Sequence, residues 1–291
     1  MGGASAARFR VAFIAGVSLM ALSLAPRLKG QVPGNPPQVG QGIPDQSHIG
    51  TSEGANDELQ YGTFGHGVER EQFGAYQKFL KQEEPEKKIR LGNEFLKRYP
   101  KSPFEERVDV GMMMTCQAQK DWKDSYAFGD SALALDPDDV DVLATVAWTI
   151  PHFYNPSDPD AGQQLDKAEK YAEHALEVMP TLRKPAHMTD AEFSEAKAKR
   201  SLQSHSALEL VYFRRQQYSD SEKEAEQAVD GNSSPDATDL FVLGADLHFL
   251  NRHTEAENAF ARCAAVASTL QNQCKQNAKA EKIQEGPSGT N

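Results

Sequence analysis

Residues 239–266 read DLFVLGADLHFLNRHTEAENAFARCAAV, and this stretch decides the fold. Its first half places Leu243 and Gly244 one turn before Leu247, and its second half places Ala256 four residues before Phe260. Both spacings put a small and a large residue on one helical face. The stretch therefore predicts two helices joined by a short turn. One such pair cannot bury its apolar face alone, so pairs must stack.

The same large–small pattern returns along the chain at a nearly constant period. Ala228 and Cys263 lie 35 residues apart in two second helices, and Met113 and Ala147 lie 34 apart in two first helices. The pattern resembles the tetratricopeptide repeat (TPR), which repeats about every 34 residues. The resemblance implies an all-α, right-handed solenoid over residues 68–285, with about five helix pairs and a C-terminal capping helix.

Individual units depart from the family pattern. Glu209 stands where a small residue is usual, and Gly129 stands where an aromatic residue is usual. No unit has a tryptophan at the usual start of its first helix. The agreement between several units, rather than the match of any one of them, carries the resemblance.

Two segments interrupt the repeat. Residues 151–164, PHFYNPSDPDAGQQ, contain three prolines and are expected to form a loop inserted between the two helices of one unit. Residues 180–206 are expected to begin as a loop, after which Thr189 and Glu192 form a capping box that opens a long helix. Insertions in a solenoid lie in loops on one face, often the binding face.

The N-terminus is typical of a targeting segment. Arg8 and Arg10 precede residues 11–25, VAFIAGVSLMALSLA, which carry no charge. This run is short for a membrane span, which needs about 20 residues, and it suits the apolar region of a signal peptide. We expect residues 1–30 to be a signal peptide or an uncleaved membrane anchor. The protein would then be exported, either periplasmic or tethered to the membrane and facing the periplasm.

The segments that flank the helical body are expected to lack regular structure. Residues 31–67 are rich in Gly, Pro and Gln and predict a disordered linker. Residues 286–291 are expected to be a disordered tail. Residues 94–103, EFLKRYPKSP, resemble the helix ends of bacterial envelope TPR proteins, including outer-membrane assembly lipoproteins, although the lipid-anchor cysteine is missing. This resemblance implies a bacterial envelope setting.

The charge of the chain lies in its helical body. The net charge is −11, while residues 1–65 contain four basic and four acidic residues. Nucleic-acid binding needs a basic patch that neutralises phosphates, so a nucleic-acid partner is not expected. The acidic surface keeps the body soluble.

Two of the three cysteines are candidates for a disulfide. On one continuous helix Cys263 and Cys274 would lie about 16 Å apart, beyond the limit of about 7 Å for a bond. Ser268 and Gln271 form the pattern of a capping box that starts a new helix. If the chain turns near Ala267, the final helix folds back and the two cysteines can pair in an oxidising compartment. The alternative is two unpaired thiols.

No catalytic motif is present. The sequence lacks His-Glu-x-x-His, Cys-x-x-Cys and Gly-x-Ser-x-Gly. Residues 136–141, DPDDVD, lack the glycine and distal glutamate of a calcium loop, so Asp138 or Asp139 is expected to cap a helix. His248 and His253 are five residues apart, which does not place them on one helical face. We therefore expect no enzyme, no cofactor and no metal site.

The remaining candidate is a binding surface. The TPR resemblance implies that the first helices line a concave groove, and aromatic and arginine side chains dominate interface energetics. The leading expectation is a non-enzymatic scaffold or adaptor that holds a partner protein or peptide. The expected groove residues are Val110, Met114, Trp148, Leu210, Phe213, Arg214, Phe241, His248 and Phe249.

The inserted loop or the final helix could instead cover this row. Trp148 is directly followed by the loop, so we favour a covered position for it. For Phe213 and Arg214 we favour the open groove, and for Phe249 both alternatives stay open. The sequence does not indicate an oligomeric state.

A second hypothesis belongs to another functional class. The chain could bind a small molecule or glycan, or serve as an accessory subunit of a cell-wall enzyme. Its pocket would lie between residues 151–164 and the groove, where Trp148, Phe153 and Tyr154 would stack on the ligand.

Overall fold

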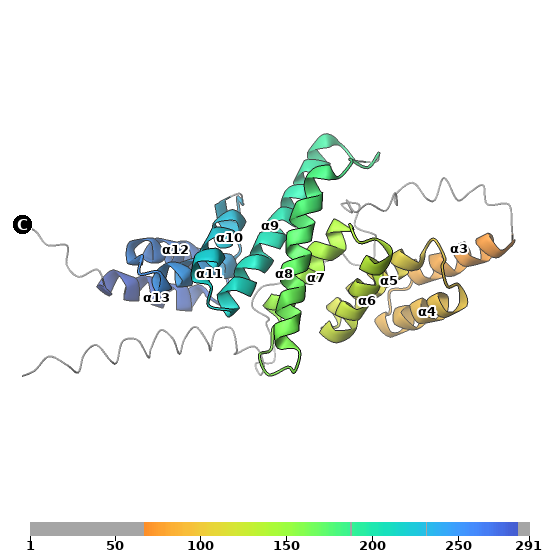
Figure 1. The fold of residues 1–291 in the computed structure, drawn as a ribbon, viewed down its shortest axis with the longest axis horizontal. Coiled ribbons are helices and arrows are strands. Elements are labelled where there is room, and N and C mark those ends of the chain that lie inside the picture. The colour runs from red at the N-terminus through yellow and green to blue at the C-terminus, as the bar shows by residue number, and fades with distance from the viewer. Residues whose placement is uncertain (1–66, 187, 231, 285–291) are drawn as a thin grey trace, which may run out of the picture.

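The computed structural model describes residues 67–186, 188–230 and 232–284. Over these residues the chain forms eleven α-helices and one short 3-10 helix, and no strand (Figure 1). The expectation of an all-α fold is therefore confirmed for this part of the chain. The expectations for residues 1–30 and for the tail at 286–291 lie outside the described residues. So does the linker expected at residues 31–67, except for Gly67, which begins the first described helix.

The helices pack in chain order as five pairs and a final helix. Each pair also contacts the next one, so the row extends from α3 at one end to α13 at the other (Figure 1). No helix among the described residues is long and apolar enough to cross a membrane. The pairs are α3 (Gly67–Leu80) with α4 (Pro85–Arg98), α5 (Glu105–Ala118) with α6 (Trp122–Leu135), α7 (Val140–His152) with α8 (Ala161–Val178), α9 (Asp190–Arg214) with α10 (Tyr218–Asp230), and α11 (Ala237–Phe249) with α12 (His253–Ala265), followed by α13 (Gln271–Gln284).

Local capping signals position two of the helices. The Asp139 carboxylate accepts hydrogen bonds from the backbone N–H groups of Asp141 and Val142, at 2.9 and 3.1 Å, and so begins α7. Thr189 and Glu192 form both bonds of a capping box and begin the 25-residue helix α9. Each cap satisfies backbone donors that have no partner within the helix. Both predictions from the sequence are confirmed.

The predicted loop at residues 151–164 is wrong at both ends. Helix α7 continues through Pro151 to His152, and α8 already begins at Ala161. Proline removes one backbone donor from a helix. In α7 that loss falls in the last turn, where the Phe153 N–H still reaches the Thr149 carbonyl oxygen at 3.1 Å. The loop is therefore limited to residues 153–160.

The turn before α13 forms, but not through the predicted capping box. Helix α13 begins at Gln271 rather than after Ser268. The Gln271 side chain donates to the carbonyl oxygen of Ala264 at 3.2 Å, and the Ser268 hydroxyl has no hydrogen-bond partner. Helix α13 nevertheless folds back on α12, and a disulfide joins Cys263 to Cys274, whose Cα atoms are 5.8 Å apart.

The hydrophobic core consists of successive clusters along the row. One cluster includes Phe79 and Met112, the next includes Leu143 and Ile150, and the C-terminal one includes Phe241. Each cluster draws residues from neighbouring helix pairs, as stacking of repeated units requires. The pairs therefore stabilise one another through shared apolar contacts.

Candidate functional site

Three of the expected groove residues lie in the core instead. Leu210, Phe213 and Phe241 are 1%, 7% and 2% exposed. All three belong to the C-terminal cluster, where the Phe241 ring packs edge-on against Phe260 with centroids 5.7 Å apart. The expectation that they line an open groove is wrong, because they pack under the neighbouring helices rather than beside them.

The Arg214 side chain is held by contacts within the chain. Its Nε and Nη2 atoms donate to the carbonyl oxygen of Pro151, at 2.9 and 2.5 Å. Its guanidinium group also lies over the Tyr154 ring, 4.8 Å from the centroid. Burial lowers the pKa of Arg214 to about 10, where it is still a cation at neutral pH. The prediction of Arg214 as an open groove residue is therefore wrong: the side chain caps the end of α7.

The aromatic residues around Trp148 stack on one another. Trp148 lies 3.7 Å from the His152 ring, centroid to centroid, and meets Phe153 edge-on. Phe153 in turn stacks on Trp122 with centroids 3.9 Å apart. Phe153, the first residue of the loop, thus packs against the edge of Trp148, which itself stays half-buried. The rings expected to stack on a ligand already pack on chain neighbours, so the geometry offers no support for the second hypothesis.

The expected row nevertheless leaves some apolar side chains partly open. Val110 and Met114 on α5 are half-buried against the central cluster. Phe249 on α11 is half-buried and stacks on Tyr218, with centroids 4.2 Å apart. We define the first-helix surface as the half-buried residues Val110, Met114, Trp148 and Phe249.

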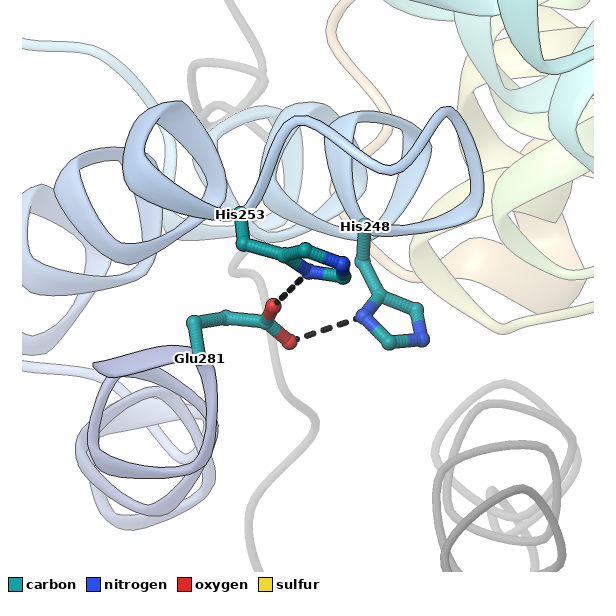
Figure 2. Close-up of side chains that lie close together, drawn as sticks. All are labelled: His248, His253 and Glu281. Atoms are coloured by element: carbon teal, nitrogen blue, oxygen red, sulfur yellow. Dashed lines mark hydrogen bonds and ion pairs between the residues drawn. The ribbon is translucent and has the colours of Figure 1, made fainter. Parts of the chain in front are cut away.

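The last expected groove residue, His248, belongs to a cluster that the sequence did not predict. His248 lies near the end of α11, His253 begins α12, and Glu281 lies on α13, and the three side chains converge (Figure 2). The Nδ1 atoms of His248 and His253 each lie 2.8 Å from a different oxygen of the Glu281 carboxylate. One carboxylate therefore bridges two imidazoles.

The chain turn between α11 and α12 brings the two histidines together. Asn251 adopts a left-handed conformation with φ of 61°, and the helices on either side of the turn place His248 and His253 beside each other. On one continuous helix the two histidines would not share a face, but they lie on opposite sides of the predicted turn, one in α11 and one in α12. Nothing local to Glu281, 28 residues after His253, signals its place in the cluster.

The cluster has the composition of a metal site. Glu281 is only 1% exposed. Burial would raise the pKa of its carboxyl group, but the imidazoles of His248 and His253 beside it outweigh that effect and lower the pKa. One potential ligand atom from each residue lies within 4.8 Å of the other two. Two imidazoles and a carboxylate are a ligand set that suits zinc and related transition metals.

The contact of His248 with Glu281 is close but poorly aligned. The Nδ1 atom of His248 lies 2.8 Å from the carboxylate, yet it makes no hydrogen bond of good geometry and is buried from water. His253 makes a hydrogen bond to the same carboxylate. A buried ring nitrogen without a well-directed partner retains coordinating capacity.

A group of buried carboxyls lies in the adjacent core. Glu209 and Asp246 are fully buried and Asp239 is 5% exposed. Burial, followed by the charge of Asp236, raises the pKa of Asp239 to about 7, and burial raises that of Asp246 to about 8. Burial also raises the pKa of Glu209 well above its ordinary value. Each of these three carboxyl groups therefore binds its proton more tightly than a solvent-exposed carboxyl does.

Comparison with protein-family models and with curated proteins identifies no relative. No protein-family model matches the chain, and no curated protein matches it significantly.

Proposed function

We propose that this chain is a non-enzymatic, TPR-like scaffold that binds a partner protein through the first-helix surface. One observation carries the proposal: Val110, Met114, Trp148 and Phe249 stay half-buried on the first helices of three pairs. A partner protein can bury the apolar surface that such partly exposed side chains present on the packed helices. The TPR assignment rests on the spacing of the repeats and on the pairwise packing of the helices.

The charge of the body favours a basic partner. The chain carries a net charge of −11. Its first 65 residues contain equal numbers of basic and acidic residues, so the negative charge belongs to the helical body. Complementary charge steers association and favours the right partner. We therefore propose an amphipathic segment of another protein, with apolar residues on the first-helix surface and lysine or arginine beside them.

The proposed location is the periplasmic side of a bacterial envelope. Disulfides form and persist in oxidising compartments, and Cys263 and Cys274 are joined by one. The uncharged run at residues 11–25, after Arg8 and Arg10, supports export as well.

Site-specific photo-cross-linking in the producing cell tests this function. A photoreactive phenylalanine analogue would replace Met114 or Phe249 on the proposed surface. The matched control position is Leu135, an exposed apolar residue at the end of α6 that is 50% exposed. We expect the same protein to be cross-linked from Met114 and Phe249 and not from Leu135.

Two outcomes contradict the proposal. Cross-links of equal yield from Leu135 would mean that contact is not specific to the first helices. The absence of a protein adduct from both Met114 and Phe249, in a chain that keeps its wild-type melting temperature, would mean that no partner covers this surface.

A further inference from the structure

We propose that His248, His253 and Glu281 form a Zn²⁺ site that clamps α13 onto the turn between α11 and α12 (Figure 2). The inference goes beyond the scaffold function and does not depend on any partner. Each ligand comes from a different helix, so a bound ion would link three helices at the C-terminal end of the row.

The geometry is close to that of a zinc site. Zinc binds imidazole nitrogen and carboxylate oxygen at about 2.0–2.2 Å, so ligand atoms around a tetrahedral ion lie about 3.3 Å apart. In this cluster the two nitrogen–oxygen contacts are both 2.8 Å, and the three ligand atoms all lie within 4.8 Å of one another. Displacements of about one ångström would admit the ion between them, well within ordinary side-chain motion.

The ligand chemistry selects the kind of metal. Two nitrogens and one oxygen suit Zn²⁺, whereas Mg²⁺ and Ca²⁺ prefer oxygen ligands alone. Three protein ligands leave the fourth tetrahedral position for water. The side chains of His248 and His253 are 16% and 25% exposed, so the two imidazole rings reach the surface beside the buried Glu281 carboxylate.

The surrounding structure holds the ligands in place. Glu281 is nearly fully buried, and the disulfide between Cys263 and Cys274 fixes the opposite end of the α12–α13 hairpin. Arg252, next to His253 in the chain, is engaged by Glu222 and Glu255. Lys282, next to Glu281, pairs with Glu257 at 4.0 Å. These two cations are therefore directed to other carboxylates than that of Glu281. A pre-positioned set of ligands loses less entropy when it binds an ion.

Calorimetric titration of the untagged, chelator-treated full chain with Zn²⁺ tests the site. We expect one Zn²⁺ per chain. In the variants His253→Gln and Glu281→Gln we expect affinity to fall at least about tenfold. The matched control is His205→Gln, because His205 also contacts a carboxylate, that of Glu224 at 2.7 Å, but only as a pair. It should bind Zn²⁺ like the wild type.

A second measurement keeps the inference testable if the variants fold poorly. Co²⁺ added to the wild-type chain should give the intense visible absorption of four-coordinate cobalt with nitrogen and oxygen ligands, and Zn²⁺ should displace it. The inference is overturned if the wild type binds no Zn²⁺ at this stoichiometry. It is also overturned if folded His253→Gln binds as tightly as the wild type, or if cobalt shows only the weak spectrum of the hydrated ion.

Discussion

The guanidinium group of Arg214 donates two hydrogen bonds to the carbonyl oxygen of Pro151, which lies 63 residues earlier in the chain. This carbonyl is in the last turn of α7, where no further helical N–H can reach it. Arg214 thus supplies the missing donors and holds the end of α9 against the end of α7. The contact adds to the packing of α9 on α7 and α8, which joins the third helix pair to the fourth.

Replacing Arg214 with methionine should lower the free energy of unfolding by about 1–3 kcal/mol. The variant keeps a long apolar stem but leaves the Pro151 carbonyl without its donor. Urea unfolding followed by circular dichroism measures the change. Arg183→Met is the control, because Arg183 is exposed, and it should stay within about 0.5 kcal/mol of the wild type. Equal stability of both variants would show that the cap contributes nothing.

Replacing two glycines with alanine should change the stability of the protein in opposite directions. A Cβ atom at Gly244 would lie 2.8 Å from two carbons of the Phe260 ring, whereas a Cβ at Gly74 would meet nothing within 4 Å. Gly244→Ala should therefore destabilise the protein by about 1–3 kcal/mol, more than the gain in helix propensity. Gly74→Ala should stabilise it by up to about 1 kcal/mol. Thermal unfolding of both variants in parallel measures the difference, and the same sign for both would contradict the packing described at Gly244.

Because of the buried carboxyl groups, we expect the free energy of unfolding to fall as the pH rises. Asp246 has its pKa raised to about 8 in the folded chain, against about 4 when unfolded. The folded state therefore holds the proton more tightly, and the stabilisation is complete below about pH 4 and lost as the pH passes 8.

Asp246→Asn should remove this dependence. The slope of unfolding free energy between pH 5 and 8 should become less negative by up to about 1.4 kcal/mol per pH unit. Urea unfolding at a series of pH values measures the slope. Asp220→Asn is the control, since Asp220 is exposed, and its slope should match the wild type. An unchanged slope in Asp246→Asn would mean that this carboxyl is ionised in the folded chain.

Reduction of the disulfide should destabilise the C-terminal end of the row. A bond that closes a loop of about this size contributes about 3 kcal/mol, and the two cysteines are 11 residues apart. Dithiothreitol should lower the stability of the wild type and raise hydrogen exchange in α13 first.

The double variant Cys263→Ser with Cys274→Ser is the control for reduction. Its stability should not respond to dithiothreitol. Burial raises the pKa of the remaining thiol, Cys116, to about 11, so this thiol is unreactive. If dithiothreitol also lowered the stability of the double variant, the reductant would not be acting through the bond between Cys263 and Cys274.

Short-range features were predictable from the sequence, and long-range contacts were not. The caps at Asp139 and Thr189 depend on residues within three positions, so local spacing was enough to find them. The contact between Arg214 and Pro151 and the convergence of His253 with Glu281 depend on how whole helices pack. No local pattern encodes such packing.

Helical periodicity has a related limit, since it does not show which apolar residues of the first helices are buried. It places Phe213 and Met114 on apolar stripes, but it does not decide which flank of a stripe the next helix covers. Phe213 is buried in the C-terminal cluster, whereas Met114 stays half-buried. The number of neighbours that pack over each position decides between core and surface.

The affinity of the cross-linked partner for a charged variant of the first-helix surface tests the central claim most directly. Met114→Lys places a cation among the apolar side chains proposed to meet a basic segment, and Leu135→Lys is the matched change at a position that is 50% exposed on α6. With both variants folded, we predict that Met114→Lys binds the purified partner at least about tenfold more weakly than the wild type, and that Leu135→Lys binds it with unchanged affinity. Wild-type affinity in Met114→Lys would contradict the proposal that this surface binds the partner.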